Sequence, residues 1–276
     1  MLAEGKCPAP AIAGASPAIE VAEQPVTLIL LPGLDGTEVF FRPLLSVLPE
    51  WVRPVVVTYP TTGANGYEDL LPLVNAAFEG RENVYVLGWS FSGPLALMAA
   101  AREPHRIKGV ILSASFVRSP IPVRAWTRLL GIAPVIGFLR FARRVPVVLG
   151  KRHDDPYRRA KAETWARVPA RVLAARIKAI LAVDASGYLG ESLHRLLYLA
   201  SSDDEIIPRQ SGAGIVREAR QAKLVTIEGP HLAMYTNPGA AVRAIVAFMQ
   251  EVHAPPSRCF NIPGELQGSV DPDTQY

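Results

Sequence analysis

A serine in a setting suited to an enzymatic nucleophile stands at position 90, within the run Gly-Trp-Ser-Phe-Ser-Gly at 88–93. The apolar, β-branched residues 83–87 predict a buried strand before it, and the Ala- and Leu-rich residues 94–102 predict a helix after it. A serine in such a turn has a strained backbone and small neighbours two residues away. Ser92 stands where this motif more often has glycine. The pattern predicts that Ser90 is a nucleophile, and the alternative is an ordinary turn between a strand and a helix.

A serine hydroxyl is a weak nucleophile, so a base must activate it. His231 follows the strand-like residues 222–228 and the turn Gly229-Pro230. That order places it on a loop at the carboxyl end of a strand, where open α/β sheets carry their sites. The other histidines lie at a helix end, in a charged run, before a strand and in the tail: His105, His153, His194 and His253. His231 is the predicted base, with a structural role in the turn as the alternative.

An imidazole that acts as a base needs a carboxylate to hold its tautomer and to stabilise the imidazolium. The strand-like residues 195–200 lead into a polar segment with three consecutive acids, Asp203, Asp204 and Glu205. Because these acids also follow the carboxyl end of a strand, they are expected on the same edge of the sheet as His231. The residue types alone leave all three acids open.

The chain order of serine, acid and histidine resembles that of the α/β-hydrolase fold superfamily, over roughly residues 25–250. In that family the acid is often followed by two residues, an apolar residue and proline, which matches the segment from Asp204 to Pro208. The resemblance therefore selects Asp204 over Asp203 and leaves Glu205 as a solvated neighbour. It also implies a mostly parallel, doubly wound α/β sheet with a helical cap inserted after the sixth strand.

A glycine-rich loop, residues 32–37, follows the strand-like residues 25–31. It is similar to a loop that in this superfamily often begins with His-Gly, although Pro32-Gly33 stands here. The resemblance implies that the backbone N–H groups of Leu34 and Phe91 form an oxyanion hole. The alternative is a plain turn that ends a strand. A phosphate-binding loop is excluded, because the downstream Gly-Lys-Ser/Thr is missing.

Alternation along the chain predicts the fold class. Strand-like runs at 26–31, 54–59, 84–88, 107–114, 195–200 and 222–228 are separated by helical runs. This order predicts a parallel sheet covered by helices on both faces, and 276 residues suffice for one such domain with an insertion. No run reaches the ~18 apolar residues that a membrane span needs.

The same patterns divide the chain into segments. Residues 25–115 and 186–253 are expected to form the α/β-hydrolase core, and 116–185 a helical cap. Residues 1–24 are expected to be a flexible segment, and 254–276 a disordered tail. Two cysteines, Cys7 and Cys259, lie in these end segments, and their spacing indicates neither a metal site nor an oxidising compartment. Since the first residues do not resemble a signal peptide, the cytoplasm is the default location.

The expected cap is strongly basic. Residues 116–182 contain 15 Lys and Arg but three acids, whereas the remainder contains 14 basic and 22 acidic residues. Three interpretations are open: arginines at the rim of an apolar lid, peripheral contact with an anionic membrane, or binding of acidic substrates such as acyl-CoA. No recognised motif accompanies the charge to indicate nucleic-acid binding. The oligomeric state is left open.

These residues predict a serine hydrolase that cleaves an ester or thioester of a hydrophobic acyl group through an acyl-enzyme. No metal or organic cofactor is implied. The expected substrate pocket contains one loop glycine, one acid and two tryptophans, namely Gly33, Asp35, Trp89 and Trp126. The alternatives are an acyltransferase with the same three residues, another chemistry of the family such as haloperoxidase or C–C hydrolase activity, and a hydrolase-like ligand receptor with slow turnover.

Overall fold

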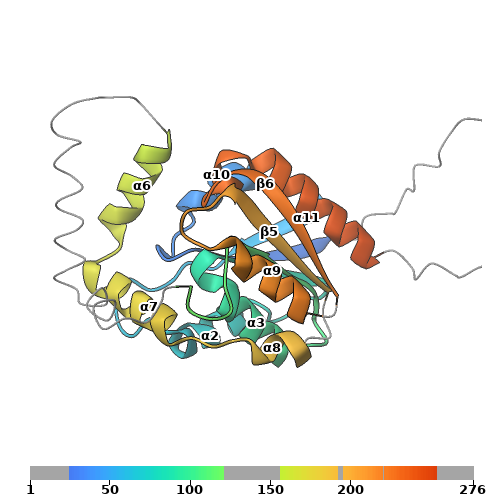
Figure 1. Cartoon of the computed structure of the whole chain (residues 1–276), viewed down its shortest axis with the longest axis horizontal. Coiled ribbons are helices and arrows are strands. Elements are labelled where there is room, and N and C mark those ends of the chain that lie inside the picture. The colour runs from blue at the N-terminus through green and yellow to red at the C-terminus, as the bar shows by residue number, and fades with distance from the viewer. Residues whose placement is uncertain (1–24, 121–155, 192–194, 220, 254–276) are drawn as a thin grey trace, which may run out of the picture.

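The computed structural model describes residues 25–120, 156–191, 195–219 and 221–253 (Figure 1). Their centre is a parallel six-stranded sheet in the order β2-β1-β3-β4-β5-β6. The strands are β1 Val26–Leu31, β2 Val52–Val56, β3 Val84–Trp89, β4 Ile107–Ser113, β5 Arg195–Asp203 and β6 Ala222–Pro230. The predicted parallel sheet is thereby confirmed.

The second strand lies earlier in the chain than the sequence pattern predicted. β2 spans Val52–Val56 rather than 54–59, and it contains Pro54. It is an edge strand with one neighbour, so the missing N–H of a proline is tolerated there. Beyond it the chain leaves the ladder, and the Tyr59 N–H donates to the Gly36 carbonyl at 2.8 Å. The segment after β2 therefore reaches the loop that follows β1.

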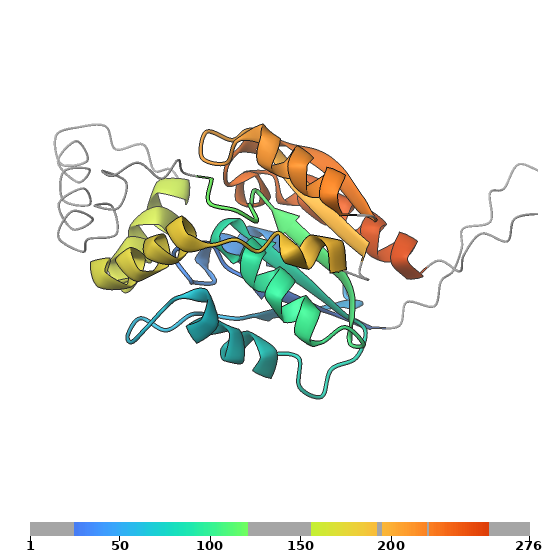
Figure 2. The same ribbon diagram turned by 60° about the horizontal axis from the view of Figure 1, so that its bottom comes forward.

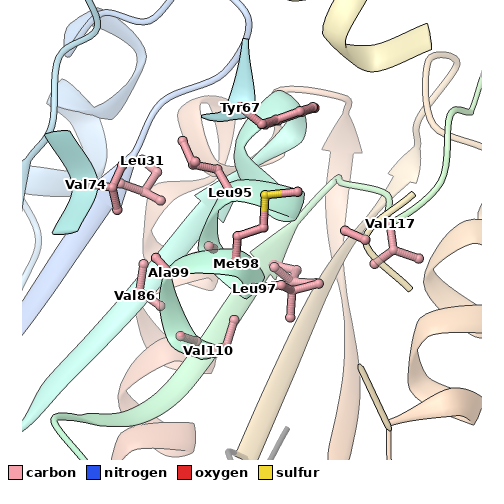
Figure 3. Close-up of a cluster of buried hydrophobic side chains, with 14 of the residues drawn as sticks. Leu31, Tyr67, Val74, Val86, Leu95, Leu97, Met98, Ala99, Val110 and Val117 are labelled. Carbon is pink, nitrogen blue, oxygen red and sulfur yellow. The ribbon is translucent and has the colours of Figure 1, made fainter. Parts of the chain in front are cut away.

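Helices cover both faces of the sheet, as the alternation predicted (Figures 1 and 2). One face carries α2 Tyr67–Ala76, α3 Gly93–Arg102, α8 Gly187–Glu191 and α9 Arg209–Glu218. The other carries the 3-10 turn η1 Val39–Phe41, α1 Arg42–Leu45, α10 Ala233–Thr236 and α11 Pro238–His253. Figure 3 shows the first core, where Leu95 and Ala99 of α3 lie among Val86 of β3 and Val110 of β4.

Two further helices, α6 Pro156–Arg167 and α7 Ala170–Ala182, are inserted between β4 and β5 and lie beyond one end of the sheet (Figure 1). Among the described residues four strands precede this insertion, so it follows the fourth strand and not the sixth as expected. The two ends of the insertion lie side by side. The Ala185 N–H donates to the Val117 carbonyl at 2.8 Å, and the backbones of Arg118 and Asp184 form an isolated antiparallel β-bridge. The excursion thus leaves and rejoins the sheet at one place.

Part of the expected cap, residues 121–155, lies outside the described residues, as do both end segments. None of the helices within the described residues is both long enough and apolar enough to cross a membrane.

Candidate functional site

The turn after β3 has the strained geometry expected of a nucleophile elbow. Ser90 has a φ of +49°, a conformation that costs a non-glycine residue energy and projects its side chain from the turn. Gly88 is required there, because a Cβ atom on it would lie 2.4 Å from the Ser92 carbonyl oxygen and 2.9 Å from the Ala96 Cβ. A short 3-10 turn, η2 Ser90–Ser92, joins the strand to α3. Ser92 is the last residue of this turn and directly precedes α3.

Hydrogen bonds from other elements hold the carbonyl groups of this turn. The Ser115 hydroxyl donates to the Ser90 carbonyl at 2.6 Å, and the Tyr67 hydroxyl donates to the Phe91 carbonyl at 3.0 Å. The rings of Tyr67 and Phe91 also stack, with centroids 4.8 Å apart. The strained turn is therefore supported from outside, as such conformations need to be.

The structure brings Ser90, His231 and Asp204 together. His231 Nε2 lies 3.0 Å from Ser90 Oγ, and His231 Nδ1 lies 2.9 Å from Asp204 Oδ2 and 3.0 Å from Oδ1. The Asp204 side chain is 5% exposed and the His231 side chain 13%, so water is largely kept from their contact. This is the geometry in which a histidine can take a proton from a serine hydroxyl.

The Asp204 carboxylate is held in its ionised form. Burial acts to raise its pKa, but the hydrogen bond from His231 and those from the backbone N–H groups of Ile207 and Ile206 outweigh burial, so the pKa lies below its usual 3.8. An ionised Asp204 accepts a hydrogen bond from Nδ1–H of the imidazole. The unprotonated Nε2 of that tautomer then faces Ser90 as an acceptor.

The neighbouring acids lie apart from the imidazole. Asp203 and Glu205 are exposed, and the Ser202 hydroxyl donates to Asp203 Oδ2 at 2.8 Å. The same Ser202 oxygen accepts the Gly229 N–H at 3.0 Å, which joins the acid loop to the loop before His231. Of the three acids that the residue types left open, the structure places Asp204 against the imidazole.

The remaining histidines are remote from this cluster or lie outside the described residues. His105 is exposed in a turn, whereas His153 and His194 are outside the described residues. His253, expected in the tail, is the last residue of α11, where its Nδ1 lies 2.9 Å from the Met249 carbonyl and 3.0 Å from the Tyr85 hydroxyl.

The loop 32–37 lies beside the elbow, since a Cβ built on Gly33 would come within 4.0 Å of the Ser90 Cβ. The Gly33 carbonyl accepts the Gly36 N–H at 3.0 Å. In a trans peptide the N–H points opposite to the C=O, so the Leu34 N–H points away from that turn. The Leu34 N–H is therefore not directed into the turn, and its role as an oxyanion donor, like that of the Phe91 N–H beside Ser90, stays a prediction.

Asp35 belongs to the same loop. Its carboxylate accepts hydrogen bonds from the Thr37 N–H at 3.0 Å and from the Thr37 hydroxyl. Burial raises the pKa of Asp35, and the hydrogen bonds from Thr37 oppose that rise.

A cavity of about 530 Å³ opens onto Ser90 and His231. Of the expected pocket residues, Gly33, Asp35 and Trp89 line it, and Trp126 lies outside the described residues. The inserted segment contributes Trp165 from α6, Val168 from the turn after α6, and Leu173, Ile177 and Ile180 from α7. Sequence reasoning missed these five residues, although their helical spacing was a usable signal.

No cluster of three or more His, Cys, Asp or Glu side chains that could hold a metal ion occurs in the part of the chain that the structure describes.

Comparison with known proteins decides the family. The model of the alpha/beta hydrolase family matches residues 28–245, a span that includes the elbow, the acid loop and His231. The chain belongs to the alpha/beta hydrolase family. It is an enzyme of this hydrolase type.

Individual relatives are distant. The hydrolase is 24% identical over 248 residues to RutD of Agrobacterium fabrum, named as a candidate carbamate hydrolase, with 83% of this chain and 94% of that protein covered. Its fold is similar to an esterase from Exiguobacterium antarcticum (TM-score 0.69, 16% identity, 82% and 92% covered). It is also similar to a bromoperoxidase from Bacillus anthracis (TM-score 0.70, 15% identity, 82% and 92% covered).

Proposed function

We propose that this hydrolase cleaves a carboxylic ester or thioester through an acyl-enzyme. The observation that carries the proposal is the hydrogen-bonded series Asp204, His231 and Ser90, which ends at an apolar cavity. Ser90 is the nucleophile, His231 the base and Asp204 the residue that orients the base.

In the first half-reaction, Ser90 Oγ bonds to the acyl carbon while its proton moves to His231 Nε2, and the carbonyl electron pair moves to the oxygen. The N–H groups of Leu34 and Phe91 stabilise that oxyanion, and one such donor is typically worth about 3 kcal/mol in the transition state. The leaving alcohol or thiol takes the proton from His231 as its bond breaks. Water then attacks the acyl-enzyme by the same steps and releases the acid.

The cavity favours a hydrophobic acyl group, because most of its lining side chains are aromatic or aliphatic, some from α6 and α7 and the others from the core and its loops. Asp35 and Lys161 bring charge to its lining among the described residues. The similarity to RutD adds carbamates to the substrates worth testing. Binding of acyl-CoA or of an anionic membrane by the basic segment 116–182 stays a sequence prediction, because several of its arginines, among them Arg140, Arg143 and Arg144, lie outside the described residues.

A fluorophosphonate probe followed by a series of p-nitrophenyl esters of increasing chain length tests the proposal. The wild-type enzyme should be labelled and should prefer medium-chain esters, and Ser90→Ala should abolish labelling. Ser92→Gly is the comparison variant: it should still be labelled, although more slowly than the wild type, because the Ser92 hydroxyl bonds to the Pro32 carbonyl and does not attack the probe. Loss of labelling in Ser92→Gly but not in Ser90→Ala would overturn the assignment.

The same assay separates the alternative functions. Labelling without turnover of any ester or carbamate would favour the receptor with slow turnover. Formation of a new ester when alcohol is added, at the expense of free acid, would favour acyl transfer.

A further inference from the structure

Arg176, in the middle of α7, is fully buried and makes all its described hydrogen bonds to carbonyl oxygens of the core. Its Nη1 donates to the Leu34 carbonyl at 2.9 Å, and its Nη2 donates to the Pro60 carbonyl at 3.0 Å. Its Nε and Nη2 donate to Asn65 Oδ1 at 3.2 and 2.8 Å. One guanidinium thus joins an inserted helix to the loops after β1 and β2.

Within the described residues the hydrogen-bond partners of Arg176 are carbonyl oxygens and include no carboxylate. Burial of a guanidinium without a carboxylate partner is unfavourable, and an apolar residue could fasten the helix at lower free-energy cost. Burial lowers the pKa of Arg176 to about 10, against the opposing influence of Tyr59 and Asp35. The group therefore stays charged at neutral pH. The Tyr59 ring, 5.4 Å from Arg176 Cζ, supplies a further favourable contact for that charge.

The loop after β1 passes directly over this guanidinium. Gly36 has a φ of +71°, and a Cβ atom on it would lie 2.5 Å from Arg176 Nη1. Both the conformation and the close approach require glycine. The loop and the arginine are therefore fitted to each other.

Four carbonyl groups of the loop are fixed by separate donors. The Pro32 carbonyl accepts from the Ser92 hydroxyl, and the Leu34 carbonyl accepts from Arg176. Backbone N–H groups bind the other two, at Gly33 and Gly36. Tyr59 contacts both side-chain donors: its hydroxyl lies 2.6 Å from Ser92 Oγ, and its ring packs against the guanidinium of Arg176.

We propose that Arg176 is a positioning residue for the oxyanion loop: by holding the Leu34 carbonyl, in the peptide that follows the donor, it keeps the loop in the conformation in which the Gly33–Leu34 peptide directs the Leu34 N–H toward the oxyanion at Ser90. This inference rests on the proposed function. Leu173, Ile177 and Ile180 of the same helix line the cavity. Arg176 therefore also links the position of α7 to the orientation of the oxyanion donor. An acyl chain that packs against α7 then raises kcat as well as lowering KM.

The test compares Arg176→Met and Arg176→Lys with Arg171→Met, a matched control that removes an exposed charge from the same helix. We expect kcat for p-nitrophenyl butyrate to fall about 100-fold in Arg176→Met, because that is the typical loss for one oxyanion donor. KM should change less than about threefold, and Arg171→Met should match the wild type. Arg176→Lys, which keeps the charge but not the planar fork, should lie between them.

A trifluoromethyl ketone provides a readout that a purely structural role would not change. It forms a hemiketal oxyanion on Ser90, so its affinity should fall in parallel with kcat, whereas the affinity of the matching non-reactive alcohol should stay constant. If Arg176→Met does not fold, Arg176→Lys carries the test. A folded variant with a lower Tm but wild-type kcat and ketone affinity would overturn the proposal.

One additional measurement on the wild-type enzyme distinguishes failure of this inference from failure of the proposed function. Intact-mass detection of an acyl group on Ser90 during turnover tests the acyl-enzyme. Its presence together with unchanged Arg176 variants rejects only the positioning role, and its absence rejects the proposed function and this inference with it.

Discussion

The two inserted helices line one cavity but are fastened to the core in opposite ways. α7 is held by Arg176, which is buried and charged. α6 is held at the surface, where Arg42 donates to both carboxylate oxygens of Glu163 at 2.8 Å and to Glu38 at 2.9 Å. Arg167 of α6 closes the network by donating to Glu38 at 2.8 Å and to Glu163.

The two kinds of attachment differ in how easily each helix can shift relative to the catalytic residues. Exposed ion pairs contribute little to stability and are screened by salt, so α6 can adjust to a substrate at small cost. A buried guanidinium with fixed carbonyl partners loses much more if it moves. We infer that α7 is a fixed part of the site, and that α6 is its adaptable part.

The largest expected effect is at Asp204, which belongs to neither helix, and the effects of changes in α6 and α7 can be compared with it. Asp204→Asn should lower kcat about 10⁴-fold, the loss seen for the corresponding change in serine proteases, because an amide favours the wrong imidazole tautomer. The Tm should stay near that of the wild type, which would show that the loss of kcat does not come from unfolding. Steady-state kinetics with p-nitrophenyl butyrate provides the measurement.

Asp203→Asn is the matched control for that change and should cost less than about tenfold, since Asp203 is exposed and contacts Ser202. Equal losses from both variants would mean that the two carboxylates act together, and the assignment of Asp204 alone would be wrong.

An intermediate effect is expected from narrowing the cavity on the α7 side. Ile177→Trp should lower kcat/KM for p-nitrophenyl decanoate about 10- to 100-fold and leave the acetate within about threefold, because pocket discrimination by a few methylene groups has this size. The chain-length profile of kcat/KM provides the measurement. Lys178→Trp, on the exposed side of the same helix, should keep the wild-type profile. An unchanged profile in Ile177→Trp would place the acyl group elsewhere.

The smallest effect is expected at the α6 network. Glu163→Gln should lower Tm by about 1–3 °C at low salt, and the difference should vanish near 1 M salt, because exposed pairs are weak and screened. The loss of Tm in Arg176→Met should persist at both salt concentrations. A salt-independent loss in Glu163→Gln would contradict the contrast between the two helices.

The same network predicts the direction of a pH effect. The hydrogen bond from Arg167 is the main cause that lowers the pKa of Glu38 to about 2; burial opposes this shift, and the hydrogen bond from Arg42 adds to it. The pKa of Glu163 is also lowered, chiefly by its hydrogen bond from Arg42. A carboxylate with a depressed folded pKa stabilises the protein above its unfolded pKa, near 4.5, and that contribution is lost as pH falls toward the folded value. The Tm difference between wild type and Glu163→Gln should therefore shrink from pH 6 to pH 3.

Much of the core site could be predicted from the sequence, because its signals are local. Ser90, His231 and the acids each follow a strand and a turn that can be identified from neighbouring residues, and parallel strands bring their carboxyl ends to one edge. The first strand was predicted with its observed bounds, Val26–Leu31. Where local signals were ambiguous, as with Pro54 in β2, the prediction was wrong by two residues or more.

The role of Ser92 shows what local signals do not contain. Its hydroxyl looked like a mild departure from a motif, yet it bonds to Tyr59 and to the Pro32 carbonyl of the oxyanion loop. Those partners lie 33 and 60 residues away in the chain. Nothing near Ser92 in the sequence indicates them.

The sequence by itself predicted the parallel fold and placed Ser90, His231 and three candidate acids at strand ends, because hydrophobic periodicity and turn chemistry act within a few residues of one another. The choice of Asp204 among those acids came from the family resemblance. Only the tertiary structure decided that Arg176, among the basic residues of the segment 116–182 that the structure describes, is buried against the oxyanion loop. The physical reason is that the burial of a charge depends on carbonyl groups from distant segments, at Leu34, Pro60 and Asn65, which meet Arg176 only after the chain has folded.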